Sequence, residues 1–293
     1  MPILGCLAFQ CQMPGAISFM RAAYDPRVDV AEIKQRQRAV WGQGEYRSLS
    51  RMLEPAAIAL CDACAMSSGQ DVLDVAAGDG NFAVAAARQG AVVVASDLSP
   101  GMVQRGRARS AEEGFAIEWV EADAEELPFE DERFDCVGSV FGAMIPPRPE
   151  VVARELFRVT RPGGIVGMTA WTPESFASRL FDIARQYLPP PPDMPLPKEW
   201  GREEVVRSRF DGLAAALEFR RGALHWTAES FEDLGRRLEA TPPQAAIKEN
   251  LPRERHEAMQ AEQLGLAREW NSATGGAVRI EAEYLISVAR KRG

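Results

Sequence analysis

Apolar and polar positions follow two different periods through the middle of the chain. Short apolar runs such as "VLDVA" and "AVVVA" show no polar alternation, which is typical of strands covered on both faces of a sheet. Between these runs, apolar residues recur at helical spacing. We expect strands at 71–76, 91–96, 116–122, 134–140 and 164–170, and helices at 81–89, 99–113 and 149–160. Strands that alternate with helices predict βαβ units, a parallel sheet and therefore an α/β fold.

The segments on either side of this alternation have other patterns. Helices are expected at 29–41 and 50–65 before it, joined by the glycine-containing "WGQGEY". After it we expect helices at 174–187, 202–210, 229–240 and 253–269, a proline-rich connection at 188–197, a strand or bent hairpin at 216–227 and a final strand at 277–291. This pattern predicts five regions: a flexible tail at 1–25, a helical lid at 26–70, an α/β core at 71–171, a cap with one late strand at 172–272, and the last strand at 273–293.

Composition narrows the class of protein. The chain has 293 residues and a formal net charge of −8, which disfavours general binding to nucleic acids or anionic membranes. No apolar run approaches the roughly 18 residues of a membrane span. The first twenty residues lack a basic start and are interrupted by Pro14, so we expect no secretion signal and a cytoplasmic protein, with Met20 as a second candidate start.

The cysteines and histidines predict no disulfide framework and no metal site. Five cysteines are sparse and odd in number for a chain of this length. The pair in "CDAC" (61–64) has the spacing of one packed helix face, and no second pair of ligands accompanies it. The two histidines, His225 and His256, are far apart, and we expect His225 to be structural.

The glycine-containing loop after the first strand is the strongest sign of a ligand site. "GDGNFA" fits the dinucleotide pattern G-x-G-x-x-A, and Asp97 comes about where a ribose-binding acid belongs, so an NAD(P)-dependent oxidoreductase is one alternative. Asp79 argues against it, because a carboxylate at the helix N-terminus would oppose a pyrophosphate but not the cationic S-adenosylmethionine. Asp79 capping the next helix or facing solvent is the competing interpretation.

Four motifs in order at compatible spacing carry a resemblance to a known family. They are "VLDVAAGDGN", "ASDLSPGM", "VEADAEELPFEDERFDCV" and "LFRVTRPGG". The chain resembles the class I S-adenosylmethionine-dependent methyltransferases, of the type that includes the ubiquinone/menaquinone methyltransferases. The resemblance spans roughly Trp41 to the C-terminus and is densest at 70–171. It implies a Rossmann-like, doubly wound, seven-stranded and mostly parallel sheet with an antiparallel last strand, an N-terminal helical lid and a helical cap insertion.

The resemblance also implies a cofactor, S-adenosyl-L-methionine, and a set of residues around it. Asp97 would take the ribose hydroxyls, and Asp123 with Ala124 would contact adenine. Asp74 lies inside an apolar strand, where an unpaired carboxylate would be costly to bury, so we expect it to accept hydrogen bonds from the glycine loop. Ala76 stands where the family usually has a first glycine. The full expected set is Trp41, Tyr46, Asp74, Ala76, Gly78, Asp79, Gly80, Asp97, Leu98, Met102, Asp123, Ala124 and Phe141.

The expected function is therefore methyl transfer to a small-molecule acceptor by in-line displacement. The expected lid and cap lack strong basic character, which favours a partly apolar metabolite over nucleic acid as the methyl acceptor. The acceptor atom (O, N, S or C), the catalytic residue and the oligomeric state are not assigned. Two alternatives stay open, namely the NAD(P)-dependent oxidoreductase and a noncatalytic methyltransferase-like binding module.

Overall fold

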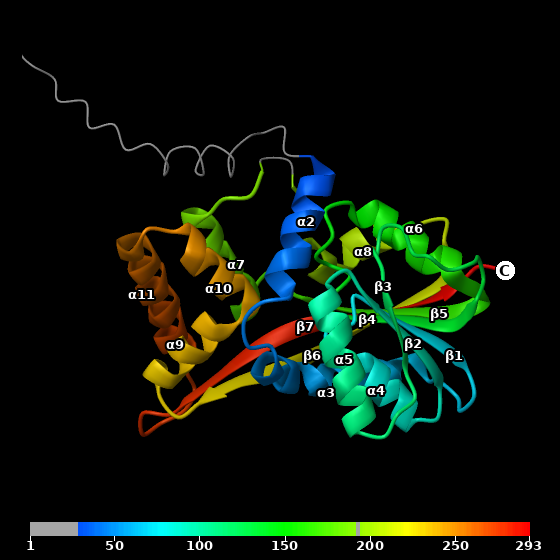
Figure 1. Ribbon diagram of the computed structural model, residues 1–293, viewed down its shortest axis with the longest axis horizontal. Coiled ribbons are helices and arrows are strands. Elements are labelled where there is room, and N and C mark those ends of the chain that lie inside the picture. The colour runs from blue at the N-terminus through cyan, green and yellow to red at the C-terminus, as the bar shows by residue number, and fades with distance from the viewer. Residues whose placement is uncertain (1–28, 192–193) are drawn as a thin grey trace, which may run out of the picture.

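A seven-stranded sheet runs through the molecule in the order β3-β2-β1-β4-β5-β7-β6 (Figure 1). The computed structural model describes residues 29–191 and 194–293, so the predicted tail and the candidate start at Met20 lie outside the described residues. The strands are β1 (Asp71–Val75), β2 (Val92–Asp97), β3 (Glu118–Glu121), β4 (Phe134–Val140), β5 (Thr160–Trp171), β6 (Ala214–Ala228) and β7 (Val278–Lys291). Neighbouring strands from β3 to β5 pair in parallel, and β7 pairs antiparallel with both β5 and β6. This is the predicted Rossmann-like sheet with an antiparallel last strand.

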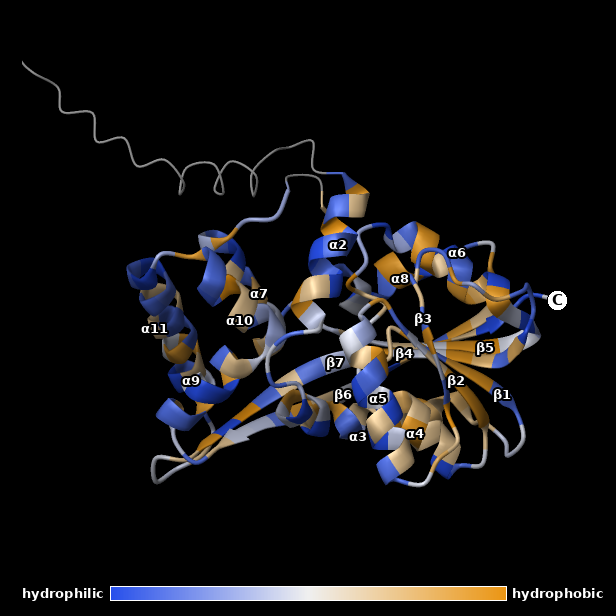
Figure 2. Cartoon of the chain, viewed as in Figure 1, coloured by the Kyte–Doolittle hydropathy of each residue, from blue (hydrophilic) through white to orange (hydrophobic). Residues whose placement is uncertain are grey.

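Helices cover both faces of the sheet. One face carries α3 (Arg47–Cys64), α4 (Asn81–Arg88) and α5 (Pro100–Glu112), and the other carries α6 (Pro149–Val159) and α8 (Glu203–Arg209) (Figure 1). A 3-10 turn, η1 (Pro197–Gly201), packs against β5. Because both faces are covered, the strands of the parallel part are apolar almost throughout (Figure 2).

A second group of helices lies beside the sheet rather than on its faces. It comprises α2 (Val30–Trp41), α7 (Phe176–Tyr187), α9 (Phe231–Ala240), α10 (Pro242–Asn250) and α11 (Arg253–Trp270) (Figure 1). The last three are inserted between β6 and β7, and those two long strands reach α9 and α11 and pack against them. No helix in the described ranges is long and apolar enough to cross a membrane.

Residues 216–227 form a strand, the first of the two forms expected for them, because β6 pairs with β7 along its whole length. Two details differ from the sequence-based expectation. Strand β5 begins at Thr160 instead of 164, since an irregularity in its pairing with β4 accommodates the "RPGG" segment. Helix α10 was not predicted: two prolines open it, and proline is compatible with a first helical turn, where no N–H bond is needed.

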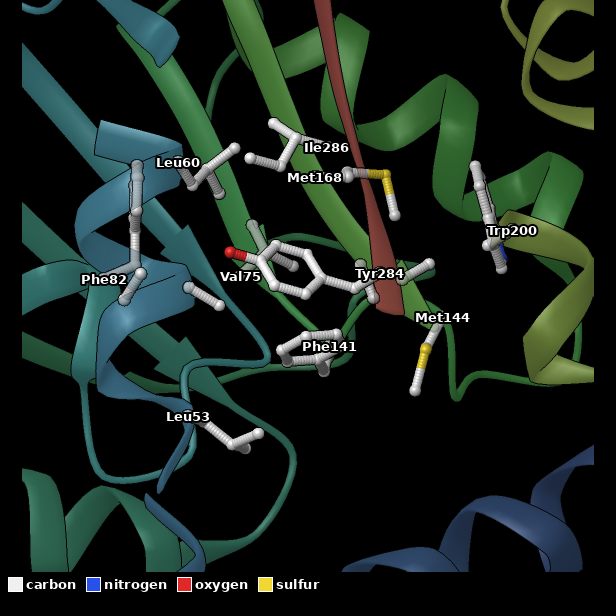
Figure 3. Close-up of a cluster of buried hydrophobic side chains, with 14 of the residues drawn as sticks. Leu53, Leu60, Val75, Phe82, Phe141, Met144, Met168, Trp200, Tyr284 and Ile286 are labelled. Atoms are coloured by element: carbon white, nitrogen blue, oxygen red, sulfur yellow. The ribbon is translucent and has the colours of Figure 1, made fainter. Parts of the chain in front are cut away.

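The hydrophobic core joins the sheet to both helical groups. Buried side chains from α3, β1, β4, β5 and β7 form one cluster, which includes Leu53, Phe82, Phe141 and Tyr284 (Figure 3). Phe141 follows directly after β4, and its ring lies next to that of Tyr284, with centroids 5.6 Å apart. The core therefore fixes the carboxyl end of β4, which borders the site described next.

Candidate cofactor and acceptor site

One large cavity opens at the carboxyl ends of the parallel strands. Its empty volume is about 1380 Å³, including the open mouth. The floor comes from segments that follow strand ends, namely Ala76 and Gly78 after β1, 97–98 at β2, 122–124 after β3 and 140–146 after β4. The walls come from α2, α7, α9 and α10. This is the edge of an open α/β sheet at which ligands bind.

The glycine loop presents its backbone to this cavity. Ala76, Gly78 and Gly80 have φ angles of +53°, +60° and +92°, in the left-handed region that favours glycine. A Cβ on Gly78 would lie 2.6 Å from the hydroxyl oxygen of Tyr46, so the tyrosine can approach only because that Cβ is absent. A Cβ on Gly80 would lie 2.9 Å from the ring of Trp119. The loop thus needs glycine at 78 and 80 for close packing, and Ala76 keeps the same backbone form at a cost in strain.

Asp97 is the acidic residue best placed for a ligand. Its Oδ2 accepts from the Gly78 N–H and its Oδ1 from the Ser99 N–H, each at 2.8 Å. The residue is 8% exposed, and burial raises the pKa of this carboxyl to about 6. Since each carboxylate oxygen has a second lone pair, both can still accept a hydrogen bond from a ligand hydroxyl.

Asp79 turns away from the cavity and forms a buried polar cluster. Its Oδ1 accepts from the Ser50 hydroxyl at 2.5 Å and from Arg109 Nη1 at 3.2 Å. Arg109 Nη1 also donates to Asn81 Oδ1 at 2.7 Å. Burial raises the pKa of Asp79. The structure therefore places Asp79 inside the protein and outside the cavity lining, bonded to Ser50 and Arg109, where it neither caps the next helix nor faces solvent.

Asp74 and Gly80 also lie outside the cavity lining. Asp74 Oδ2 accepts from the backbone N–H of Ala83 at 2.9 Å, in the first turn of α4 and not in the glycine loop as expected. Burial raises the pKa of Asp74 well above its usual value. The other expected residues, Trp41, Tyr46, Ala76, Gly78, Asp97, Leu98, Met102, Asp123, Ala124 and Phe141, all line the cavity.

Helix α2 is bound to the floor by charged groups that the sequence analysis did not single out. Lys34 Nζ lies 2.5 Å from Asp123 Oδ2 and 2.5 Å from Glu125 Oε2. The Glu125 side chain is fully buried and also accepts from the backbone N–H and the Nε of Arg148. Arg38 pairs with Glu121. Nothing in the sequence near Lys34 distinguished it from a solvated helix face, because its partners lie about ninety positions later.

Aromatic side chains enclose two sides of the cavity. Trp41 and Tyr46 meet edge to face, with centroids 6.3 Å apart. Phe141 stacks on Trp171 at 4.1 Å with an interplanar angle of 14°. Trp171 and Trp226 also line the cavity, and the sequence analysis named neither of them.

The remaining candidate chemical groups lie elsewhere. His225 projects from β6, 3.8 Å from Glu281 and away from the cavity lining. Cys61, Cys64 and Cys136 are free and buried, and burial raises the pKa of the Cys61 thiol above its usual range. No cluster of three potential metal ligands exists among residues 29–191 and 194–293.

Comparison with known proteins agrees with this geometry. A methyltransferase domain model matches residues 72–164. An uncharacterised protein of Mycobacterium tuberculosis is 40% identical over 189 residues, which cover 64% of this chain and 69% of that protein. A demethylmenaquinone methyltransferase of Clavibacter sepedonicus is 38% identical over 135 residues, 45% of this chain and 55% of the relative.

Solved structures share the fold. A Bacillus halodurans protein described as a methyltransferase superposes with a TM-score of 0.56 at 24% identity, covering 81% of this chain and 99% of that one. A Haemonchus contortus phosphoethanolamine N-methyltransferase gives 0.52 at 20% identity, covering 82% of this chain and 53% of that one. The chain belongs to the class I S-adenosylmethionine-dependent methyltransferases, of the type that includes the ubiquinone/menaquinone methyltransferases.

Proposed function

We propose that this chain binds S-adenosyl-L-methionine in the cavity and methylates a small-molecule acceptor held in the same space. The observation that carries the proposal is the Asp97 carboxylate, which lies at the end of β2, lines the cavity and keeps free lone pairs on both oxygens. A carboxylate that is already oriented by two backbone N–H groups is well suited to accept two neighbouring hydroxyls.

The surrounding residues fit such a cofactor. Asp97 would hold the ribose, Asp123 and Ala124 would contact the adenine with Leu98 and Met102 beside it, and Gly78 would bring bare backbone near the amino-acid end. Trp41 and Tyr46 would cover it from α2 and the start of α3. When bound, the cofactor supplies a methyl group activated by a sulfonium, so the protein needs mainly to align the acceptor and exclude water.

The same geometry disfavours a dinucleotide. A pyrophosphate needs the open N-terminus of the helix after the glycine loop. Here Asn81 at the start of α4 is 7% exposed and bonded to Ser50 and Arg109, and neither Gly80 nor Asn81 lines the cavity. The buried Asp79 carboxylate lies beside that helix start and would oppose an incoming phosphate.

The cavity extends beyond the residues proposed to hold the cofactor, to side chains of α7, α9 and α10. An acceptor bound beside the cofactor would be covered by α7 and α10, which supports methyl transfer over a noncatalytic binding role.

Parallel calorimetric titrations test the proposal. S-Adenosylhomocysteine should bind at one site per chain, and NADH should give no saturable heat. Asp97→Ala should lower the affinity for S-adenosylhomocysteine by about tenfold or more, since charge-assisted hydrogen bonds are worth about 1.5–3 kcal/mol. Tight NADH binding without S-adenosylhomocysteine binding would overturn the proposal.

A further inference from the structure

A second, smaller cavity lies within the group of helices beside the sheet. It opens between α9, α10 and α11, which pack against one another (Figure 1). Polar side chains make up most of its lining, namely Glu232, Arg236, Glu239, Gln244, Gln260 and Gln263. None of these six residues belongs to the set proposed to hold the cofactor, so this cavity is a separate place at which a ligand could bind.

Gln263 is a buried polar side chain in this lining that lacks a partner. The residue is 2% exposed, and its Nε2 is buried without a hydrogen-bond partner within the described part of the chain. A buried amide N–H without an acceptor destabilises a fold, and native proteins rarely leave one unpaired. Because Gln263 lines the second cavity, an acceptor atom of a bound molecule would satisfy it.

Glu239 on α9 can take the opposite partner. Hydrogen bonding to Lys248 outweighs burial and lowers the pKa of this carboxyl, with Gln260 as a further donor, so Glu239 is ionised at neutral pH. An ionised carboxylate only accepts hydrogen bonds, and its two oxygens have about four lone-pair sites. Two donors from the protein therefore leave room for a third donor from a ligand.

The charges of this lining are already paired. Arg236 lies 3.2 Å from Glu232, and Lys248 pairs with Glu239. Each of the three charged side chains in the lining thus has an ionic partner among the described residues. A charged ligand would lose hydration without gaining a free opposite charge. The chemistry of the wall favours an uncharged ligand that both donates and accepts hydrogen bonds.

We propose that the second cavity binds a small uncharged molecule with several hydroxyl groups, of the polyol or sugar class. Each hydroxyl donates and accepts, so neighbouring hydroxyls match both the free N–H of Gln263 and the carboxylate of Glu239. Leu238 and Leu264 add apolar surface for the C–H groups of such a molecule. Binding there requires neither the cofactor nor the methyl acceptor, so this site is independent of the proposed function.

The second cavity shares part of its wall with the first. Leu238 on α9 and Gln244 on α10 line both cavities. A bound molecule would also bridge α9 and α11 through Glu239 and Gln263. It would therefore hold these helices, and the wall that they give to the first cavity, in one position.

Calorimetric titration of the full-length chain with four probes tests the site. D-Glucose and glycerol are uncharged polyols of two sizes, glucose 6-phosphate adds a charge, and cyclohexanol keeps a six-membered ring with a single hydroxyl. At least one of the two polyols should bind saturably. Glucose 6-phosphate and cyclohexanol should bind about tenfold more weakly than that polyol, because one lacks a countercharge and the other lacks the hydroxyls.

Gln263→Met keeps a flexible side chain of similar size but removes the amide. It should weaken polyol binding by about fivefold. The melting temperature of the ligand-free variant should stay equal or rise, because an apolar group replaces an unpaired buried one. Gln104→Met, at an exposed position of α5 outside both cavity linings, is the matched control and should leave the affinity unchanged.

Hydrogen exchange distinguishes a bound molecule from general stabilisation. Sugars and polyols stabilise many proteins because they are excluded from the protein surface. That effect does not saturate and would slow exchange throughout the chain. Occupancy of the second cavity should instead slow exchange selectively within residues 231–270.

Four results would overturn the proposed site: no saturable binding of either polyol, equal affinity for glucose 6-phosphate, equal affinities in Gln263→Met and Gln104→Met, or slowing of exchange spread evenly over the chain. The last result would mean an adventitious additive only. Parallel titration with S-adenosylhomocysteine separates this site from the proposed function. If the polyol binds in the expected way but S-adenosylhomocysteine does not, the proposed function fails and the second cavity keeps its assignment.

Discussion

The ammonium of Lys34 lies 2.5 Å from the carboxylate of Asp123, so an ion pair ties the N-terminal helix to the loop after β3. The same ammonium reaches the buried Glu125. Asp123 lines the floor where adenine is proposed to bind, and Lys34 lines the wall beside it. The position of α2 is thus coupled to the part of the site that would recognise the cofactor base.

Removing this ion pair should loosen α2. Lys34→Met keeps an apolar stem but loses hydrogen bonds to two carboxylates, worth about 2 kcal/mol in this partly buried setting. Limited proteolysis within residues 30–48 should become faster by an order of magnitude, and S-adenosylhomocysteine should slow it in the native chain. Arg253→Met, which removes an exposed pair within α11, is the control and should change nothing. Equal cleavage rates in native and Lys34→Met protein would mean that other contacts hold α2.

The affinity for S-adenosylhomocysteine should depend on the protonation of Asp97. Burial raises the pKa of this carboxyl to about 6 in the ligand-free protein. Ribose hydroxyls would stabilise the ionised form, so binding should lower this pKa and release protons near pH 6. Affinity should fall by about tenfold between pH 7 and pH 5, as the carboxylate takes up a proton. Calorimetry across this range measures the change, and Asp97→Ala should give a nearly flat profile. A native profile as flat as that of the variant would exclude Asp97 from the ribose site.

Ala76→Gly should stabilise the fold. Ala76 has φ +53°, a form that costs an alanine roughly 1–2 kcal/mol, while glycine loses about 0.5–1 kcal/mol of extra chain entropy on folding. The free energy of unfolding should therefore rise by about 0.5–1 kcal/mol, as measured by urea denaturation. Ala77→Gly is the matched control, because Ala77 has no positive φ and should only lose stability. A loss of stability in both variants would contradict the assigned strain.

Gly78→Ala should damage binding more than folding. Its Cβ would lie 2.6 Å from the Tyr46 hydroxyl oxygen and would push that ring from its place above the loop. Gly69→Ala introduces a side chain at a similar backbone angle, φ +83°, with nothing within 4 Å. Both variants should lose about 1 kcal/mol of stability, but only Gly78→Ala should lower the affinity for S-adenosylhomocysteine. Equal affinities in the two variants would show that the tyrosine contact is not needed.

Much of the sheet could be predicted because a strand that is buried on both faces needs apolar residues at almost every position. Runs such as 91–96 are apolar without alternation, and the acidic residue that ends β2 stands out against them. No such pattern identifies helix α10, since the two prolines at its start are also typical of a break between elements. Proline is tolerated in the first turn of a helix, but this position can be assigned only once the start of the helix is known.

The site was predictable where a residue acts through its own backbone position and not where it acts through distant partners. Asp97 and Gly78 follow strand ends, so their place at the sheet edge follows from the strands alone. Asp79 also lies in the loop after a strand end, but hydrogen bonds from Ser50 and Arg109 hold its carboxylate inside the protein. Lys34 and Trp226 come from a charged helix and a late strand, whose position over the cavity is a property of tertiary packing.

The central claim is that Asp97 holds the ribose of the cofactor in this cavity, and a crystal structure of the chain with S-adenosylhomocysteine measures it directly. The account predicts ribose hydroxyl oxygens about 2.5–2.8 Å from the two Asp97 carboxylate oxygens. It also predicts adenine beside Asp123 and the thioether sulfur facing the part of the cavity that α7 and α10 cover. A ligand bound elsewhere, or in this cavity with its ribose out of reach of Asp97, would contradict the account.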